Sequence, residues 1–270
     1  MLRQVKISSS RDSGEMFRRR KYASPPIVEA VCELRFEKGD WDPTTPGKFH
    51  QRIEENYPAK PREVRFFETQ MSAGTPLEAS VAVKELPNRT QFSSDDGRRV
   101  ISIGPRVLNV SELKVYSSWK EFKKRIKSSL EIYEKIASVS DPIRIGIRYI
   151  NRVVISAEDP IDLHKYFTCA PQDLSEIPHR HLPSSLAAVL SRQEYVFDDG
   201  VRLARVFANA KAPVGSIGIL LDLDVYWERS NSTKNKESAD VMALIEKLRV
   251  RERVAFEASI TDASRRIFNK

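Results

Sequence analysis

The sequence predicts an α+β fold in which two similar halves, residues 22–140 and 141–270, form one curved antiparallel sheet with long helices on one face. Apolar residues alternate with polar ones in several runs of strand length, and two longer runs repeat them at helical spacing. The turn sequence Asp-Asp-Gly occurs at residues 95–97 and again at 198–200, each time between two strand-like runs. We therefore expect a duplicated unit with the order strand, helix, hairpin strands, strand, helix. Asp and Gly are favoured in hairpin turns generally, so an independent origin of the two turns stays open.

The first half begins with a strand at residues 27–36, where apolar and polar residues alternate directly after two prolines. Thr45 and Pro46 are typical of a helix start, and Pro58 ends the helix expected at residues 46–57. Strand-like runs follow at residues 64–69, 79–85, 89–93, 100–103 and 107–110. Ser118 and Glu121 form a capping box, which opens a long amphipathic helix that reaches Ala137.

The second half begins with a strand at residues 143–155, after Asp141 and Pro142. A short helix is expected at residues 161–167, followed by a proline-interrupted loop at 170–183. Three strands are then expected at residues 186–197, 201–208 and 216–227. A polar linker precedes the closing helix, which runs from about Val241 to Ser259.

Composition limits the class of protein. The chain has 270 residues, of which 40% are apolar and 30% charged, so it is long enough to bury a full core. It lacks the run of roughly 18 apolar residues that a membrane helix needs, and its start lacks the apolar stretch of a secretory signal. We expect a cytoplasmic protein with no membrane contact. Cys32 and Cys169 lack metal-binding spacing, and free thiols are expected.

Positive charge is concentrated at the start of the chain. Residues 1–21 hold seven basic and two acidic residues and account for +5 of the net charge of +8. We expect a flexible basic tail that is solvated or docks on phosphates. The remaining +3 is ordinary for a body of this size.

No catalytic motif is present. The sequence contains neither a Gly-x-Ser-x-Gly nucleophile elbow nor a glycine-rich phosphate loop. His179 and His181 form a His-x-His pair between prolines, but a zinc site needs further ligands, and a surface loop is the preferred interpretation. We therefore expect no catalytic residues, no bound metal and no cofactor.

A row of arginines is the first candidate binding site. Arg144, Arg148 and Arg152 are four residues apart on one strand, so they share a sheet face at intervals of about 13 Å. Together with Arg202 and Arg106 they would form a stripe that pairs with phosphates or carboxylates. The alternative is that they pair with carboxylates on neighbouring strands, such as Glu29 and Glu33.

The closing helix is the second candidate. It carries Val250, Val254 and Phe256 beside charged residues, so its apolar positions occupy more than one face. A helix of this kind usually buries a second surface, which predicts self-association or docking to a partner protein.

Several short motifs occur together in the chain. They are Pro-Pro-Ile-Val-Glu-Ala-Val at residues 25–31, Gly-Pro at 104–105, Tyr-Ser-Ser-Trp at 116–119, Arg-Ile-Gly-Ile-Arg-Tyr-Ile-Asn-Arg at 144–152, and Phe-Glu followed by Ile-Thr-Asp within 256–262. With them the chain resembles, over about residues 22–268, a sporadically distributed, uncharacterised family of prokaryotic proteins that opens on the Pro-Pro-Ile-Val-Glu-Ala-Val element. The resemblance implies no activity, cofactor or catalytic residue. Its patchy occurrence is typical of mobile or defence-associated genes.

The leading functional hypothesis is a non-catalytic binding or assembly protein, a component of a prokaryotic defence or toxin–antitoxin-like system, which recognises a protein partner or a second copy of itself. A nucleic-acid-binding protein that uses the basic strand face is the first alternative. A small-ligand-binding protein or enzyme with a pocket between sheet and helices is the second.

Overall fold

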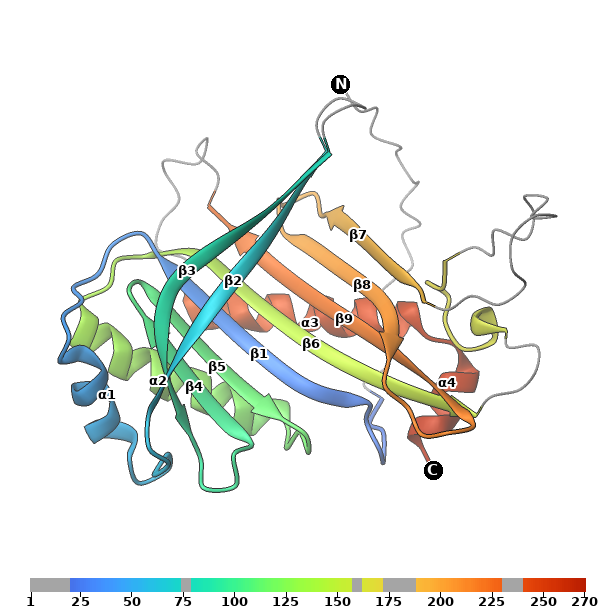
Figure 1. Cartoon of the computed structure of the whole chain (residues 1–270), viewed down its shortest axis with the longest axis horizontal. Helices are drawn as coiled ribbons and strands as arrows, with labels where there is room; N and C mark the ends of the chain where they lie inside the picture. The colour runs from blue at the N-terminus through green and yellow to red at the C-terminus, as the bar shows by residue number, and fades with distance from the viewer. Residues whose placement is uncertain (1–19, 74–78, 157–161, 172–187, 230–239) are drawn as a thin grey trace.

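The computed structural model describes residues 20–73, 79–156, 162–171, 188–229 and 240–270. Nearly all of the basic tail and the loop with His179 and His181 lie outside these ranges. Within them the chain forms one nine-stranded antiparallel sheet, four α-helices and one 3-10 turn (Figure 1). The α+β class and the large antiparallel sheet are therefore confirmed.

The first half contributes five strands and the second half four, in the sheet order β2-β3-β4-β5-β1-β6-β9-β8-β7. Their bounds are β1 Ile27–Phe36, β2 Arg62–Ala73, β3 Ala79–Ser93, β4 Arg99–Gly104, β5 Val107–Leu113, β6 Pro142–Ser156, β7 Leu190–Val196, β8 Arg202–Ala210 and β9 Ser216–Glu228. β1 and β6 pair with each other at the centre of the sheet, although more than a hundred residues separate them in the chain. The last strands of the two halves flank this central pair. β5 lies beside β1, and β9 lies beside β6.

Two long helices cover one face of the sheet. The helices are α1 Thr45–Ile53, α2 Trp119–Ala137, α3 Val241–Ser259 and α4 Asp262–Phe268, and the 3-10 turn η1 is Leu163–Lys165. Figure 1 shows α2 and α3 behind the sheet, α2 behind the strands of the first half and α3 behind those of the second. No helix in the described ranges is both long and apolar enough to span a membrane.

The predicted capping box explains where α2 starts. The Ser118 hydroxyl accepts a hydrogen bond from the Glu121 N–H at 3.2 Å, which satisfies one of the free donors of the first turn. The apolar stripe of α2 then faces the sheet, and Phe122, Ile126 and Tyr133 are fully buried there. These side chains fill the space between the sheet and α2.

Several predicted bounds need correction. The helix expected at residues 46–57 ends at Ile53, and the short helix at 161–167 is only the 3-10 turn η1. The two runs at 79–85 and 89–93 join into β3, because a bulge between the Val64–Arg89 and Phe66–Leu86 pairings accommodates Pro87. The closing helix is followed by α4, which was not predicted. Thr261 caps α4, with its hydroxyl accepting from the Ala263 N–H at 3.2 Å.

Candidate functional site

The open face is the sheet face opposite α2 and α3. Strand alternation decides which side chains reach it. On β6, Ile145, Ile147 and Tyr149 are buried toward the helices, so Arg144 and Arg148, which alternate with them, point to the open face. The three predicted stripe arginines of β6 therefore lie on this face.

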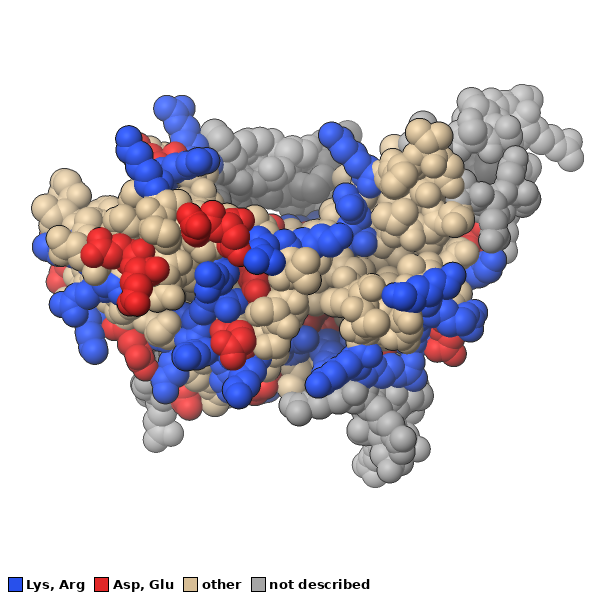
Figure 2. Space-filling view, turned by 90° about the horizontal axis from the view of Figure 1, so that it is seen from below, with Lys and Arg blue, Asp and Glu red and all other residues tan. Residues whose placement is uncertain are grey.

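Charge on the open face alternates from strand to strand around β6. β1 supplies Glu29 and Glu33, β6 supplies the arginines, and β9 supplies Asp222, Asp224 and Glu228. The register pairs Arg148 with Asp224, and Arg144 with Glu228, as direct neighbours. The basic strand thus runs between two acidic ones, which neutralises much of its charge. On the side of the molecule shown in Figure 2, Lys and Arg side chains are likewise interspersed with Asp and Glu.

The first ion-pair group is the Glu33 cluster, formed by Glu33, Arg35, Arg89 and Arg144. The Glu33 carboxylate lies 2.7 Å from Arg35 Nε, 2.9 Å from Arg89 Nη1 and 3.3 Å from Arg144 Nη1. The side chains of Arg89, Arg144 and Glu33 are only 4%, 14% and 15% exposed. Burial alone would raise the pKa of Glu33, but the Arg35, Arg89 and Arg144 guanidiniums outweigh it and lower that pKa. The cluster holds β3, β1 and β6 together across the open face.

Arg148 makes the second ion-pair group. Its Nε and Nη2 donate to the two carboxylate oxygens of Asp222 at 2.8 and 2.5 Å, which is a bidentate pair. These hydrogen bonds, and the negative charge of Asp222 and Asp224, raise the pKa of Arg148 against the effect of its burial. Asp222 is 8% exposed, whereas Arg148 is 46% exposed. The structure thus gives Arg148 a structural partner and leaves part of its guanidinium accessible.

Gly146 leaves room for the Arg144 guanidinium. A Cβ atom at Gly146 would stand 2.9 Å from Arg144 Nη1, closer than real Cβ atoms approach a neighbour, and 3.3 Å from Asp224 Oδ1, which is a tight contact. The Arg144 guanidinium lies over the Tyr226 ring, 4.5 Å from its centroid, and donates to Asp224 at 2.9 Å. Arg202 lies directly beside Tyr226 in the β8–β9 register, so this predicted stripe member extends the same row of side chains.

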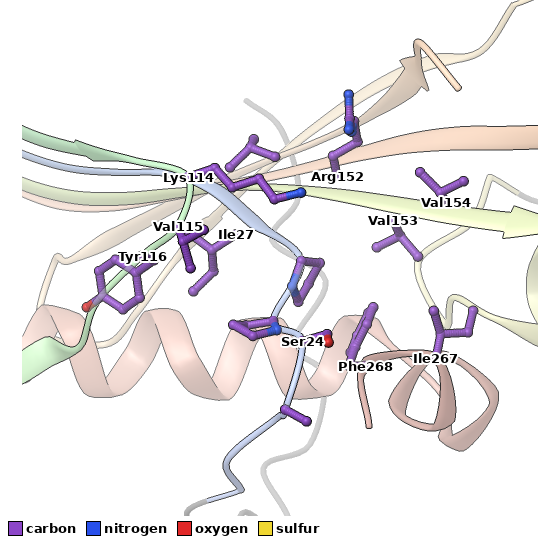
Figure 3. Close-up of a pocket in the computed structure, with 14 residues that line it drawn as sticks. Ser24, Ile27, Lys114, Val115, Tyr116, Arg152, Val153, Val154, Ile267 and Phe268 are labelled. Carbon is purple, nitrogen blue, oxygen red and sulfur yellow. The ribbon is translucent and has the colours of Figure 1, made fainter. Parts of the chain in front are cut away.

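Arg152 has a different environment from the other two β6 arginines. It lines a hollow of about 410 Å³ near the ends of β1, β6 and α4. Lys114 and Arg152 lie on one side of this hollow, and Ile267 and Phe268 lie on the opposite side (Figure 3). A second hollow of about 380 Å³ shares Val154 and Ile267 with the first. All charged residues that line the two hollows are basic, namely Lys114, Arg152, Lys165, Arg266 and Lys270.

Arg106 does not belong to the stripe. It occupies the turn between β4 and β5 with a φ of 61°, and its Nη1 donates to the backbone oxygen of Glu37 at 3.2 Å. Its own carbonyl accepts from the Phe36 N–H at 2.9 Å. The prediction placed Arg106 beside the β6 arginines, whereas its side chain is used at the end of β1.

The three predicted residues of the closing helix separate in the structure. Val250 and Val254 are 56% and 37% exposed and lie on the outer side of α3. Phe256 is buried, with its ring in contact with those of Tyr22 and Phe268. Phe256 therefore belongs to the core between α3 and α4 and is not available to a partner.

A buried polar group lies on the inner side of α3. The Glu252 carboxylate is 2.5 Å from Arg249 Nη1, and the Arg249 guanidinium lies 4.6 Å from the centroid of the Tyr149 ring. Burial raises the pKa of Glu252 to about 7, because the attraction of Arg249 offsets only part of the lost hydration. The Tyr149 hydroxyl is 2.9 Å from that of Tyr116.

Both cysteines, Cys32 and Cys169, are free thiols and both are buried. Burial raises the pKa of the Cys32 thiol and that of the Cys169 thiol, so neither is poised as a thiolate. Among the residues that the structure describes, no group of three or more His, Cys, Asp and Glu side chains is arranged to hold a metal ion.

Sequence reasoning missed the main partners of the arginines. Glu29 and Glu33 were expected as partners, and Glu33 does pair with Arg144. The closest contacts of Arg148 and Arg144, however, are with Asp222 and Asp224 of β9. The available signal was the alternation of these aspartates with Leu221 and Leu223, which places both on one face. Only the strand order shows that β9 lies beside β6 and brings these aspartates next to the arginines.

The chain was also compared with known proteins. No protein-family model matches it, and none of the curated proteins matches it.

Proposed function

We propose that the protein is a non-catalytic binding or assembly protein that recognises a partner protein through the open face. The observation that carries this proposal is the pairing of Arg144 and Arg148 with Glu33, Asp222 and Asp224. Arginines that are already paired across strands form a fixed pattern of both charges. Such a pattern suits the mixed surface of a folded protein better than a uniform row of phosphates.

Apolar side chains between the charges support the same conclusion. Val31, Ile150, Val206 and Leu220 point to the open face from four strands, and each is partly buried and partly accessible. An aromatic residue, Tyr226, lies among them. Protein interfaces combine an apolar centre with a polar surround, and this face offers both on one rigid sheet.

A site-specific photo-crosslinker tests the proposal. Placed at Ile150 on the open face, it should capture one protein in the cells from which the gene derives, whereas at Lys127, exposed on α2, it should not. The captured protein, purified separately, should bind the purified chain, and Ile150→Asp should weaken binding at least about tenfold. Equal capture from both positions, or a purified candidate that does not bind, contradicts the proposal.

The basic hollows favour a second candidate function, the binding of a phosphate-bearing ligand such as a nucleic acid. Lys114 and Arg152 are the residues involved, rather than the paired arginines of the stripe. Fluorescence polarisation with labelled single-stranded and duplex oligonucleotides tests this function. If it is correct, affinity falls steeply with salt and falls again in Lys114→Glu and Arg152→Glu. Binding that depends instead on Arg148, or no binding at low salt, contradicts it.

We also propose that the two halves arose by duplication. The strand order supports it, because β1–β6, β5–β9 and β4–β8 occupy matching positions on the two sides of the centre. Gly97 and Gly200 both adopt positive φ and donate to the residue three positions earlier, Ser94 and Phe197. Superposition of the halves in an experimental structure tests the proposal, since the two glycines must then coincide.

The cellular setting is part of the same proposal. The resemblance to a sporadically distributed prokaryotic family supports a cytoplasmic component of a defence or toxin–antitoxin-like system. Deleting the gene together with its neighbours, and restoring it alone or in combination, tests this setting by resistance to phage or by growth arrest. A phenotype that never depends on a neighbouring gene contradicts it.

A further inference from the structure

β7 forms one end of the sheet and is exposed along its length. Every residue from Leu190 to Val196 is exposed or partly exposed, and Leu190 and Val196 are 77% and 65% exposed. β7 pairs with β8 in an uninterrupted register, without a bulge. In the described chain no strand pairs with its outer edge.

The hydrogen bonds to β8 show which backbone groups face outward. Phe197 donates to the Val201 oxygen at 2.8 Å, and Asn209 donates to the Val189 oxygen at 3.2 Å. In an antiparallel ladder alternate residues direct both their N–H and C=O groups to the same neighbour. The odd-numbered residues of β7 therefore bind β8. The outward-facing backbone groups belong to Leu190, Arg192, Glu194 and Val196.

Proteins usually protect such an edge with proline, lysine, a bulge or a short strand. β7 has seven residues and none of the first three devices. Its two charged residues have opposite signs, and they pair with each other within the strand at 2.6 Å. A second strand that runs antiparallel can place a glutamate opposite Arg192 and an arginine opposite Glu194. These two charges therefore do not repel such a strand.

We infer that the outer edge of β7 pairs with β7 of a second copy of this chain, antiparallel and centred on Gln193. This register opposes Arg192 to Glu194 of the second copy and Leu190 to its Val196, and each contact occurs twice by symmetry. All four residues have outward-facing N–H and C=O groups, so every opposed pair exchanges two backbone hydrogen bonds. The side chains of these residues lie on the open face.

The charge pattern selects this register over its neighbours. Pairing centred on Arg192 would oppose two arginines, and pairing centred on Glu194 would oppose two glutamates. Like charges directly opposite each other destabilise a strand pair, whereas opposite charges stabilise it. Of these three registers, only the one centred on Gln193 opposes arginine to glutamate while it also pairs the outward-facing backbone groups.

Such a dimer forms one continuous sheet with α2 and α3 of both copies on the same face, because the two-fold axis is perpendicular to the sheet. A seven-residue edge is small compared with the roughly 1,200 Å² that stable interfaces bury, so association at micromolar concentration is expected. The open faces of the two copies would join and double the surface offered to a partner.

Charge exchange on the full-length chain tests the inference. Sedimentation from about 1 to 200 µM should show a concentration-dependent dimer, and Arg192→Glu or Glu194→Arg should raise its dissociation constant about tenfold or more. The double exchange R192E/E194R restores opposite charges across the axis and should restore the dimer. The matched controls are Lys127→Glu and Glu131→Lys on α2, which change the same charges at an exposed pair and should have no effect.

A cysteine at the two-fold axis gives an independent measurement. Gln193 faces its copy as a non-hydrogen-bonded pair with Cα atoms about 4.5 Å apart, which lies within disulfide range. Gln193→Cys should therefore form a disulfide dimer on mild oxidation. Ser191→Cys should not, because it faces Tyr195 of the second copy, and the native cysteines are buried. A monomer at all concentrations, a dimer insensitive to the charge exchanges, or a double exchange that restores nothing overturns the inference.

Discussion

Replacing Glu33 by glutamine removes the carboxylate that joins β3, β1 and β6 on the open face. Arg89 and Arg144, which are 4% and 14% exposed, then lose the negative charge that compensates their burial. Breaking a buried ion pair by removing one partner typically costs about 3–5 kcal/mol. We expect the free energy of unfolding of Glu33→Gln to fall by about this amount, since three arginines share the same carboxylate.

Thermal and urea unfolding, followed by circular dichroism, measure this effect. A loss of this size lowers the Tm by about 10 °C in a chain of this length. The control is Glu37→Gln, because Glu37 is 57% exposed and pairs with Arg229 at the surface, where about 1 kcal/mol or less is expected.

The pH dependence of the free energy of unfolding gives a second test, because the lowered pKa of Glu33 fixes its direction. The folded-state pKa of Glu33 lies below its usual value, so its stabilisation is present above about pH 4.5 and is lost as the pH falls through the folded pKa. The difference between wild type and Glu33→Gln should therefore narrow in acid. A Glu33→Gln variant within about 1 kcal/mol of wild type at pH 7 would refute the structural role of the Glu33 cluster.

Three further changes test other parts of the structure. Because the folded pKa of Glu252 is raised to about 7, stability should fall as pH rises from about 4.5 to 7, by up to about 3 kcal/mol, and Glu252→Gln should remove this slope in urea titrations. Arg148→Ala should cost about 1–2 kcal/mol, and a double-mutant cycle with Asp222→Asn should show coupling, whereas additive effects would contradict the bidentate pair. Tyr133→Phe should cost about 1–2 kcal/mol by removing the hydrogen bond to the Gly104 oxygen, as measured by thermal unfolding.

The alternation of residue types predicted the faces of the central strands well. On β6 the sequence separates Ile145, Ile147 and Tyr149 from the arginines, and the structure buries the first group under the helices. Period-two alternation follows from local backbone geometry, so a single sequence carries it. The capping box before α2 is local in the same sense, and its start was also predicted.

The partners of the arginines depend on long-range order, which the sequence alone does not contain. Asp222 meets Arg148 only because β9 lies beside β6, and that adjacency comes from the packing of the whole sheet. Short elements were missed for a related reason. α4 has seven residues, too few to be stable alone, and its position depends on the contact of Phe268 with Tyr22 and Phe256.

The central pairing of β1 with β6 has a consequence for biosynthesis. β1 is made early, yet one of its two neighbours is translated only after the rest of the first half. Until β6 is made, the edge of β1 that pairs with it, along Glu29 to Arg35, has no partner strand. The apolar side chains on one face of β1 are already present at that stage. Non-local pairing of this kind is slow, and unpaired edges promote aggregation. A nascent chain stopped before residue 142 is therefore the form of this protein most in need of a chaperone.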